Sequence, residues 1–378
     1  MDLSLSEINF PIQMYDPTRD FNKHKTEYKN AIDNVLEKGN FIGGEQVTQL
    51  EAQLVSYTNA PYVITCANGT DAIFIALKAL DIGPGDEVIT VAHTWISTAE
   101  TIAMCGANPV WVDIDPVTFC INCDLIESKI TSKTKAILPV SLYGLIPDFE
   151  TIQKIAKKYN LYVIEDGAQS FGAERDKWKS CSCAYTDIAT TSFFPTKPLG
   201  CYGDGGAIFV RDKVLAQKVR AIKSHGGLER FVHKYIGMNS RLDTIQASVL
   251  QIKMKYFDEV LQARKKCAQI YTNELNGLND LVLPFVPFNC EHVWAQYSIL
   301  AKNKTQRDML VNNLKANKIN VAIFYPVPLS AQECFSKIDS SNLDVTNNVC
   351  DRIFNLPLYG ELTLKEQLHI INLIKKLV

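Results

Sequence analysis

The sequence has no long apolar run and almost no net charge. Even the apolar residues 72–80 are interrupted by Lys78, whereas a membrane-spanning helix needs about 20 predominantly apolar residues. The 39 Lys and Arg residues nearly balance the 41 Asp and Glu residues, which gives a formal net charge of −2. No strong overall field therefore draws the chain to nucleic acid or to an anionic membrane, and we expect neither as a partner.

The sequence also lacks a disulfide framework, a metal-binding pattern and a signal peptide. Its 11 cysteines are scattered, and Cys66 and Cys105 lie in apolar runs, as buried free thiols do in a reducing compartment. Residues 1–7 have neither the basic nor the apolar region of a signal peptide, so we expect a cytoplasmic protein. Two close cysteine pairs lack nearby histidines and the spacing of a four-ligand zinc site, so we expect no metal: Cys120 with Cys123, and Cys181 with Cys183.

The composition is that of a globular protein with a sizeable core, since 47% of the 378 residues are hydrophobic and 21% are charged. Between about residues 60 and 210, short apolar runs alternate with helical patterns. The runs are apolar throughout, as in strands buried on both faces, so they predict a mostly parallel sheet covered by helices. The expected strands are residues 62–66, 87–91, 109–113, 135–140, 162–165, 187–193 and 206–210, and the expected helices include 72–80 and 149–159.

The pattern changes after residue 210, where helical stretches and turns dominate. We expect helical stretches at 212–223, 244–275, 306–316 and 364–378, and strands at 295–300 and 320–324. This change predicts a large α/β domain, residues 22–262, and a smaller α+β domain, residues 263–378, to which we assign the N-terminal arm, residues 1–21.

The first motif that could carry chemistry is residues 66–71, which follow a buried strand and open a helix. The free backbone amides of Gly69, Thr70 and Asp71 at such a helix start would suit a phosphate group. The same residues are also consistent with a plain helix cap, because Asn, Thr and Asp are common at that position.

Two further motifs carry a carboxylate and an amine. Asp166 lies at the carboxyl end of a buried strand, where open α/β sheets bind ligands, so it could pair with a cationic ring nitrogen or simply cap the next helix. Lys197 lies between two prolines and a glycine-rich turn. Desolvation there would lower the pKa of its amine and free it for covalent attachment to an aldehyde, and a solvated loop lysine is the alternative interpretation.

The order of the three motifs matters more than any one of them. A phosphate cradle, a strand-end carboxylate and a loop lysine are the contacts that pyridoxal 5′-phosphate (PLP) needs for its phosphate, its ring nitrogen and its aldehyde. Trp95 follows the expected strand 87–91 and could stack on the flat ring. No Gly-x-Gly-x-x-Gly follows the first strand, which argues against a dinucleotide-binding fold.

These motifs resemble those of the DegT/DnrJ/EryC/StrS aminotransferases, which have the fold-type I PLP-dependent transferase fold and act on nucleotide-linked keto sugars. The run 192–206 most closely resembles the branch that installs a 3-amino group on UDP-2-acetamido-2-deoxy-3-oxo-glucuronate. The matching blocks span most of the chain: residues 40–51, 68–77, 83–100, 139–144, 165–173, 192–209, 225–251 and 295–297.

The resemblance implies a role for each matching residue. Lys197 resembles the lysine that holds the cofactor and shuttles protons, Asp166 resembles the partner of the ring nitrogen, and Gln169 resembles the group that bonds the phenolic oxygen. The family is a homodimer with shared active sites, so two implied contacts come from the neighbouring subunit. The remaining implied contacts are Gly69, Thr70, Trp95 and Ser192 with the cofactor, Asn239 of the neighbour with its phosphate, and Arg241 of the neighbour and Tyr325 with the substrate.

The implied reaction is transfer of an amino group from an amino acid, glutamate, to a UDP-linked 3-keto sugar, which gives an amino sugar for glycan or polysaccharide biosynthesis. The family stretch that usually reads His-Tyr-Pro is Phe324-Tyr325-Pro326 here. Because Phe324 cannot donate a side-chain hydrogen bond to a carboxylate, this difference favours a neutral sugar over a uronate as the substrate. A C4 aminotransferase acting on a UDP- or dTDP-linked 4-keto-6-deoxy sugar is the alternative. Lys197 argues against a pyridoxamine-dependent dehydratase, and the set of Asp166, Gln169 and Lys197 argues against a regulatory protein.

Overall fold

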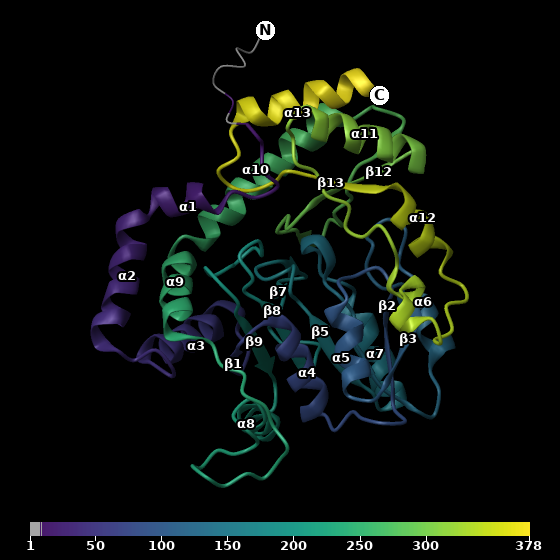
Figure 1. The fold of residues 1–378 in the computed structure, drawn as a ribbon. Coiled ribbons are helices and arrows are strands. Elements are labelled where there is room, and N and C mark those ends of the chain that lie inside the picture. Colours follow the sequence, from purple (N-terminus) through teal and green to yellow (C-terminus); the bar gives the residue numbers. More distant parts are fainter. Residues whose placement is uncertain (1–7, 9) are drawn as a thin grey trace.

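Seven strands form the central sheet of the computed structural model, which describes residues 8 and 10–378 (Figure 1). Their order is β1-β9-β8-β5-β4-β2-β3, and β9 runs antiparallel to both of its neighbours while the other adjacent pairs are parallel. The mostly parallel sheet predicted from the sequence is therefore confirmed. The strands are β1 (Tyr62–Cys66), β2 (Glu87–Val91), β3 (Asn108–Val112), β4 (Thr134–Ile137), β5 (Tyr162–Asp166), β8 (Ile188–Ser192) and β9 (Gly206–Val210).

Helices cover both faces of this sheet, which explains why its strands are apolar throughout. Successive residues of a strand point to opposite faces, so Val163 packs in the apolar cluster that includes α7 while Ile164 packs in the one that includes α4 and α5. One face is covered by α4 (Gly69–Ala79), α5 (Ser97–Met104) and α8 (Lys213–Ile222), and the other by α3 (Glu45–Thr58), α7 (Phe149–Tyr159) and α9 (Thr244–Lys255).

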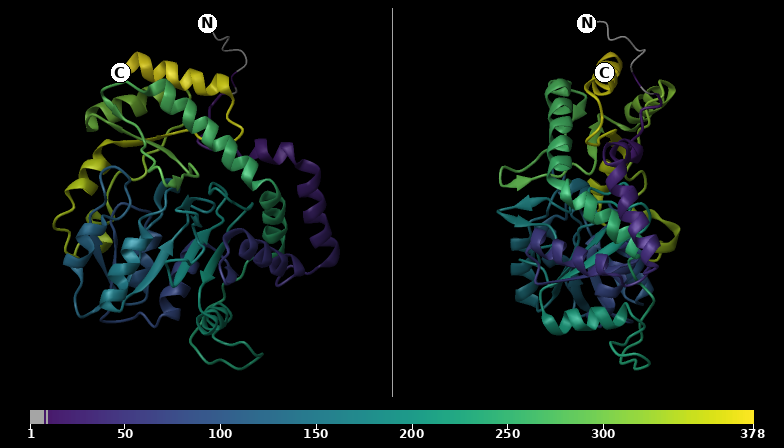
Figure 2. Two further views of the ribbon diagram at one scale, coloured as in Figure 1. Left: turned by 180° about the vertical axis from the view of Figure 1, so that it is seen from behind. Right: turned by 90° about the vertical axis from the view of Figure 1, so that its left-hand side faces the viewer.

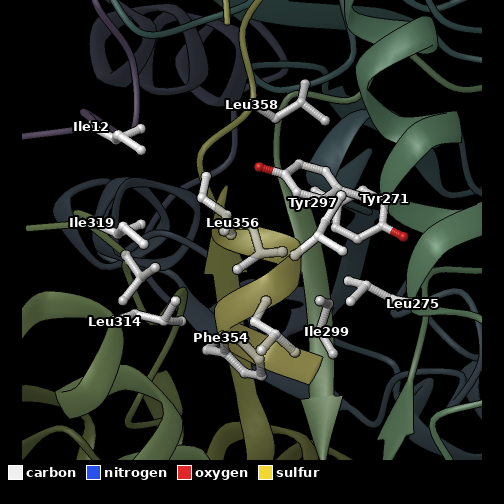
Figure 3. Close-up of a cluster of buried hydrophobic side chains, with 14 of the residues drawn as sticks. Ile12, Tyr271, Leu275, Tyr297, Ile299, Leu314, Ile319, Phe354, Leu356 and Leu358 are labelled. Atoms are coloured by element: carbon white, nitrogen blue, oxygen red, sulfur yellow. The ribbon is translucent and has the colours of Figure 1, made fainter. Parts of the chain in front are cut away.

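A second sheet of three strands lies beside the central one and builds a separate apolar core (Figures 1 and 3). Figure 3 shows the fully buried Tyr271, Tyr297 and Phe354 of this core together with Ile12 from the N-terminal arm. The backbone of Ile12 hydrogen-bonds to that of Lys318 at 2.9 Å. The sheet consists of β10 (Leu281–Val282), β12 (Tyr297–Ala301) and β13 (Ile353–Leu356), and it packs against α10 (Phe257–Leu275), α11 (Lys304–Ala316) and α13 (Leu364–Leu377).

Ile12 is the part of the N-terminal arm that packs in the core of the second sheet, and residues 1–7 and 9 of the arm lie outside the described residues. Helix α10 runs without interruption from beside the central sheet to the second sheet (Figure 2), so the boundary expected at residues 262–263 falls inside a helix. The division into two domains therefore stays a prediction.

Two expected elements differ in the structure. The helical stretch 244–275 is divided at Tyr256 into α9 and α10. The strand expected at 320–324 does not form, because its hydrogen bonds go to two unrelated partners: Asn320 donates to the Ile12 carbonyl at 2.9 Å, and Ala322 pairs with Asn355 in an isolated bridge.

The remaining elements surround the two sheets. The loop that follows α8 extends away from the rest of the chain in both views of Figure 2 and exposes Leu228, Phe231 and Ile236. No helix of the described residues combines the length and the apolar character needed to cross a membrane. The helices and strands that surround the two sheets are α1 (Pro17–Lys23), α2 (Lys25–Lys38), α6 (Cys123–Ile126), α12 (Asp344–Arg352) and a small sheet of β6 (Glu174–Arg175), β7 (Trp178–Lys179) and β11 (Cys290–Glu291).

Candidate active site

The carboxyl ends of β1, β2, β5 and β8 lie at one edge of the central sheet, and each is followed by a motif singled out in the sequence. At the end of β1, the side chain of Asn68 caps α4 by accepting a hydrogen bond of 2.8 Å from the Asp71 amide. The first amides of a helix have no partner within it, so those of Gly69 and Thr70 are available to an anion. A Cβ atom on Gly69 would lie 2.7 Å from that of Ser192, which places the end of β8 against the start of α4.

Asp166 is buried at the end of β5, and both of its carboxylate oxygens are engaged. Oδ2 accepts a hydrogen bond of 2.7 Å from the Thr98 hydroxyl, and Oδ1 accepts one of 3.2 Å from the Ala168 amide. Burial raises the pKa of the carboxyl, while these hydrogen bonds and the charge of Lys197 oppose the shift. Sequence reasoning missed Thr98, whose only signal was a hydroxyl side chain shortly after Trp95.

Lys197 lies in the turn that follows β8, close enough to Asp166 for the two charges to interact. Burial lowers the pKa of its amine, and the negative charge of Asp166 opposes the shift. Within the described part of the chain, its Nζ atom makes no hydrogen bond or ion pair, so the amine is not engaged by a structural partner. A Cβ atom on Gly200 would lie 2.6 Å from the Phe194 carbonyl oxygen, which explains the need for glycine in this turn.

Gln169, Tyr325 and Trp95 come together at the same edge of the sheet. The Gln169 side chain accepts a hydrogen bond of 2.9 Å from the Tyr143 amide and donates one of 3.1 Å to the Tyr325 hydroxyl. The rings of Trp95 and Tyr325 lie 6.3 Å apart, and Trp95 is 57% exposed, so one face of the indole is open to a ligand. Tyr143 was not expected at the site, because nothing in the local sequence shows that its backbone reaches Gln169.

Comparison with known proteins identifies the family of the chain. The model of the DegT/DnrJ/EryC1/StrS aminotransferase family matches residues 22–375. The chain belongs to this family. It is therefore an aminotransferase, and its cofactor is PLP, as the three motifs predicted.

Three individual comparisons show how similar the chain is to known proteins. The UDP-2-acetamido-2-deoxy-3-oxo-D-glucuronate aminotransferase of Pseudomonas aeruginosa is 45% identical over 335 residues, which cover 89% of this chain and 91% of the relative. A pleiotropic regulatory protein of Geobacillus stearothermophilus is 42% identical over 364 residues, 95% of this chain and 96% of the relative. The solved structure of NtdA from Bacillus subtilis with bound PMP has a TM-score of 0.90 and 31% identity, and the match covers 100% of this chain and 86% of that one.

The residues of this aminotransferase fit PLP on observations that need no comparison. The contact between Gly69 and Ser192 leaves no room for a side chain at the helix start, so backbone amides would hold a phosphate there. The buried carboxylate of Asp166 and the unengaged amine of Lys197 lie close enough for their charges to interact, and they would meet the ring nitrogen and the aldehyde of the cofactor. The exposed face of Trp95 completes the set.

The two residues expected to serve a neighbouring subunit are not drawn into this cluster. Asn239 and Arg241 are both exposed, and among the described residues neither side chain hydrogen-bonds to a group of the site. Ser240 between them is buried and bonded to the start of α4, since its hydroxyl contacts the Ala67 amide at 3.0 Å and Asp71 Oδ2 at 2.6 Å.

Proposed function

We propose that this aminotransferase transfers an amino group from glutamate to a UDP-linked 3-keto sugar and so supplies an amino sugar for polysaccharide biosynthesis. The observation that carries the proposal is the unengaged amine of Lys197 near the buried carboxylate of Asp166, in the turn after β8, whose last residue, Ser192, packs against the start of α4. The similarity to the Pseudomonas aeruginosa relative supports a UDP-linked sugar with a 3-keto group.

Each step of the reaction has a residue to perform it. PLP, when bound, supplies an electron sink that stabilises negative charge on the carbon losing its proton. Lys197 Nζ takes the proton from Cα of the amino acid and, in the second half of the reaction, returns a proton to the sugar carbon that gains nitrogen. Its lowered pKa leaves the amine unprotonated at a lower pH than an ordinary lysine, as a general base requires.

The other residues hold the reacting groups in place. Asp166, oriented by Thr98 and Ala168, would keep the ring nitrogen protonated, and that positive charge would offset the burial that raises the pKa of the carboxyl. Two side chains offer donors to ligand oxygens, Gln169 and Tyr325. The phosphate would be held by Gly69, Thr70 and Ser192, with Trp95 against the ring.

We also infer that the enzyme is a cytoplasmic homodimer in which Asn239 and Arg241 complete the partner's site. The exposure of both side chains, on a loop that Ser240 fixes to the chain's own α4, supports this arrangement. The 11 free cysteines support a reducing compartment.

Hybrid dimers test whether the sites are shared. A Lys197→Ala chain is inactive, and Asn239→Asp would place a repelling carboxylate beside the phosphate. If the sites are shared, co-expression gives hybrids with one site carrying both changes and one intact site, so activity returns. Hybrids as inactive as the two parents would contradict shared sites.

A neutral sugar is favoured over a uronate by the contacts of Phe324. Its ring packs on the apolar cluster that includes α7, and its amide donates to Asn355 at 2.9 Å, so it offers a bound carboxylate no donor. The 4-keto-6-deoxy sugar stays the second candidate, because the residues around Lys197 suit amination at either ring carbon.

A substrate panel tests the proposed reaction. The PLP-loaded enzyme is incubated with glutamate and with UDP- and dTDP-linked sugars that carry a 3-keto or a 4-keto group, as neutral sugars and as uronates. Mass spectrometry should detect amination of a UDP-linked 3-keto sugar by the wild type and none by Lys197→Ala. Amination of 4-keto sugars alone would support the second candidate and contradict the first.

A further inference from the structure

A buried histidine that no part of the reaction uses lies behind the candidate active site. His93 follows β2 and is fully buried, with its Nε2 atom 2.8 Å from the Tyr143 hydroxyl and its Nδ1 atom 3.3 Å from Cys350 Sγ. The Tyr143 hydroxyl in turn donates to the backbone carbonyl of Phe324. A continuous chain of hydrogen bonds therefore runs from α12, through the end of β2, to the residue that precedes Tyr325.

The chemistry of the groups sets the direction of each hydrogen bond. A carbonyl oxygen only accepts, so Tyr143 uses its single hydroxyl proton on Phe324 and must accept from His93 Nε2. Burial lowers the pKa of His93 to about 4, so its imidazole is neutral at physiological pH. With its proton on Nε2, the neutral ring has an acceptor at Nδ1, which faces the Cys350 thiol.

Tyr143 has a second contact with the site through its backbone. Its amide donates to Gln169 Oε1 at 2.9 Å, which turns the Gln169 amide so that its nitrogen donates to the Tyr325 hydroxyl at 3.1 Å. Since Tyr325 accepts from Gln169, its own hydroxyl proton is available to a ligand. Tyr143 itself has a φ of 57°, a left-handed conformation that a bulky residue rarely adopts without support from its surroundings.

We propose that His93 is a positioning residue of the active site, which acts through Tyr143 to hold Gln169 and Tyr325 as paired donors. Tyr143 holds both ends of the arrangement, the backbone before Tyr325 and the amide of Gln169. The ligands that would use the two donors are oxygen acceptors, the phenolic oxygen of the cofactor and a keto or hydroxyl oxygen of the sugar. The inference rests on the proposed function and adds a residue that touches neither ligand.

Four variants of the holoenzyme test the inference. His93→Phe keeps a ring but removes the N–H donor, His93→Gln keeps an N–H donor, and Tyr143→Phe removes the hydroxyl while its amide still reaches Gln169. The fourth is the double variant His93→Phe/Tyr143→Phe. His292→Phe is the matched control, because His292 is a second buried histidine whose Nδ1 accepts from the Trp294 amide, outside this chain of bonds.

Two measurements separate positioning from general stability. The first is kcat/KM for the keto sugar, and the second is the pH midpoint of the visible absorption of bound PLP, which reports on donors to its phenolic oxygen. We expect His93→Phe and Tyr143→Phe each to lower kcat/KM about 10- to 100-fold and to shift the midpoint in the same direction. The double variant should lose no more than the larger single loss, and His93→Gln should recover most of it.

Other results would overturn the inference. It is wrong if the double variant loses the product of the two single losses, or if His93→Gln is as impaired as His93→Phe. It is also wrong if neither kcat/KM nor the absorption midpoint changes. The same holds if both change only in proportion to a loss in melting temperature, as we expect for His292→Phe. An enzyme that binds PLP but aminates no sugar of the panel would contradict the proposed substrate instead, and the absorption measurements would still decide the role of His93.

Discussion

Ser240 donates a hydrogen bond of 2.6 Å to Asp71 in the first turn of α4. The same hydroxyl oxygen accepts a bond of 3.0 Å from the Ala67 amide, so one buried side chain joins the loop of Asn239 and Arg241 to the proposed phosphate cradle. The two features, which are about 170 residues apart in the sequence, therefore form one structural unit.

Ser240→Ala should weaken PLP binding about tenfold, because it removes the partner of the part-buried Asp71 carboxylate and Ala67 amide and so frees the proposed phosphate cradle from the loop that holds it. Titration of the cofactor-free protein with PLP, followed by fluorescence, measures the dissociation constant. Ser248→Ala is a suitable control, since among the described residues the Ser248 hydroxyl bonds to the Ile245 carbonyl on its own helix, α9, and to no group of the site. Equal PLP affinities in the two variants would contradict this account.

Lys197 should be the residue that carries PLP covalently, because its amine has no structural partner within the described chain. Borohydride reduction of the holoenzyme followed by peptide mass spectrometry should find the cofactor's mass on Lys197 and none in Lys197→Ala. Lys223 is the matched control, since it is also buried with a lowered pKa but donates to the Thr65 carbonyl at 2.6 Å. Lys223→Met should keep the label, and a label on Lys223 itself would contradict the assignment.

Asp166→Asn should lower the activity about 100-fold or more. The same substitution should stabilise the cofactor-free protein at neutral pH. Burial raises the folded-state pKa of Asp166 above the ordinary value of 3.8, so ionisation costs the folded state more than the unfolded state. This cost of ionising Asp166 is complete at a pH above its folded-state pKa, and it disappears at a pH below its unfolded-state pKa. The gain in melting temperature should therefore shrink as the pH falls toward 4, and a gain that grows on acidification would be the wrong sign.

Gly69→Ala should destabilise the protein by about 1–3 kcal/mol, because the new methyl group would lie 2.7 Å from Ser192 Cβ and the two elements would have to separate. Denaturant unfolding measures the free energy of unfolding, and the PLP dissociation constant should rise in parallel. Gly83→Ala makes the same chemical change where the nearest atom is 3.8 Å away, so it should be close to neutral. Equal losses in the two variants would show that the contact with Ser192 is unimportant.

The parts of the site that the sequence could predict are those set by local rules. Apolar runs identified the strands that hold Asp166 and precede Lys197, and the position of both at strand ends followed from how parallel sheets bind ligands. The bond between Gln169 and Tyr325 joins residues 156 positions apart, and that between His93 and Tyr143 joins residues 50 apart. Such pairs depend on tertiary packing and leave no periodic pattern in one sequence.

The fold shows the same limit. The strand expected at 320–324 has a suitable apolar composition, but its ends pair with the N-terminal arm and with Asn355, which no local pattern indicates. The short strand β13 and the helices α1, α2 and α3 were also not anticipated, and α3 contributes Leu50 and Leu54 to the core under the central sheet.

The antiparallel direction of β9 determines the kind of loop in which Lys197 lies. If β9 were parallel to β8, the chain would have to cross from the carboxyl end of β8 to the other end of the sheet. Because β9 is antiparallel, it begins beside the carboxyl end of β8, and Phe193 donates to the Gly205 carbonyl at 2.7 Å. The lysine thus lies in a loop closed at its base by the pairing of two core strands. Phe193, Leu199 and Cys201 of this loop are buried in the cluster that also holds Ala207 and Phe209 of β9, so the loop that carries the amine is fixed to the sheet along its length.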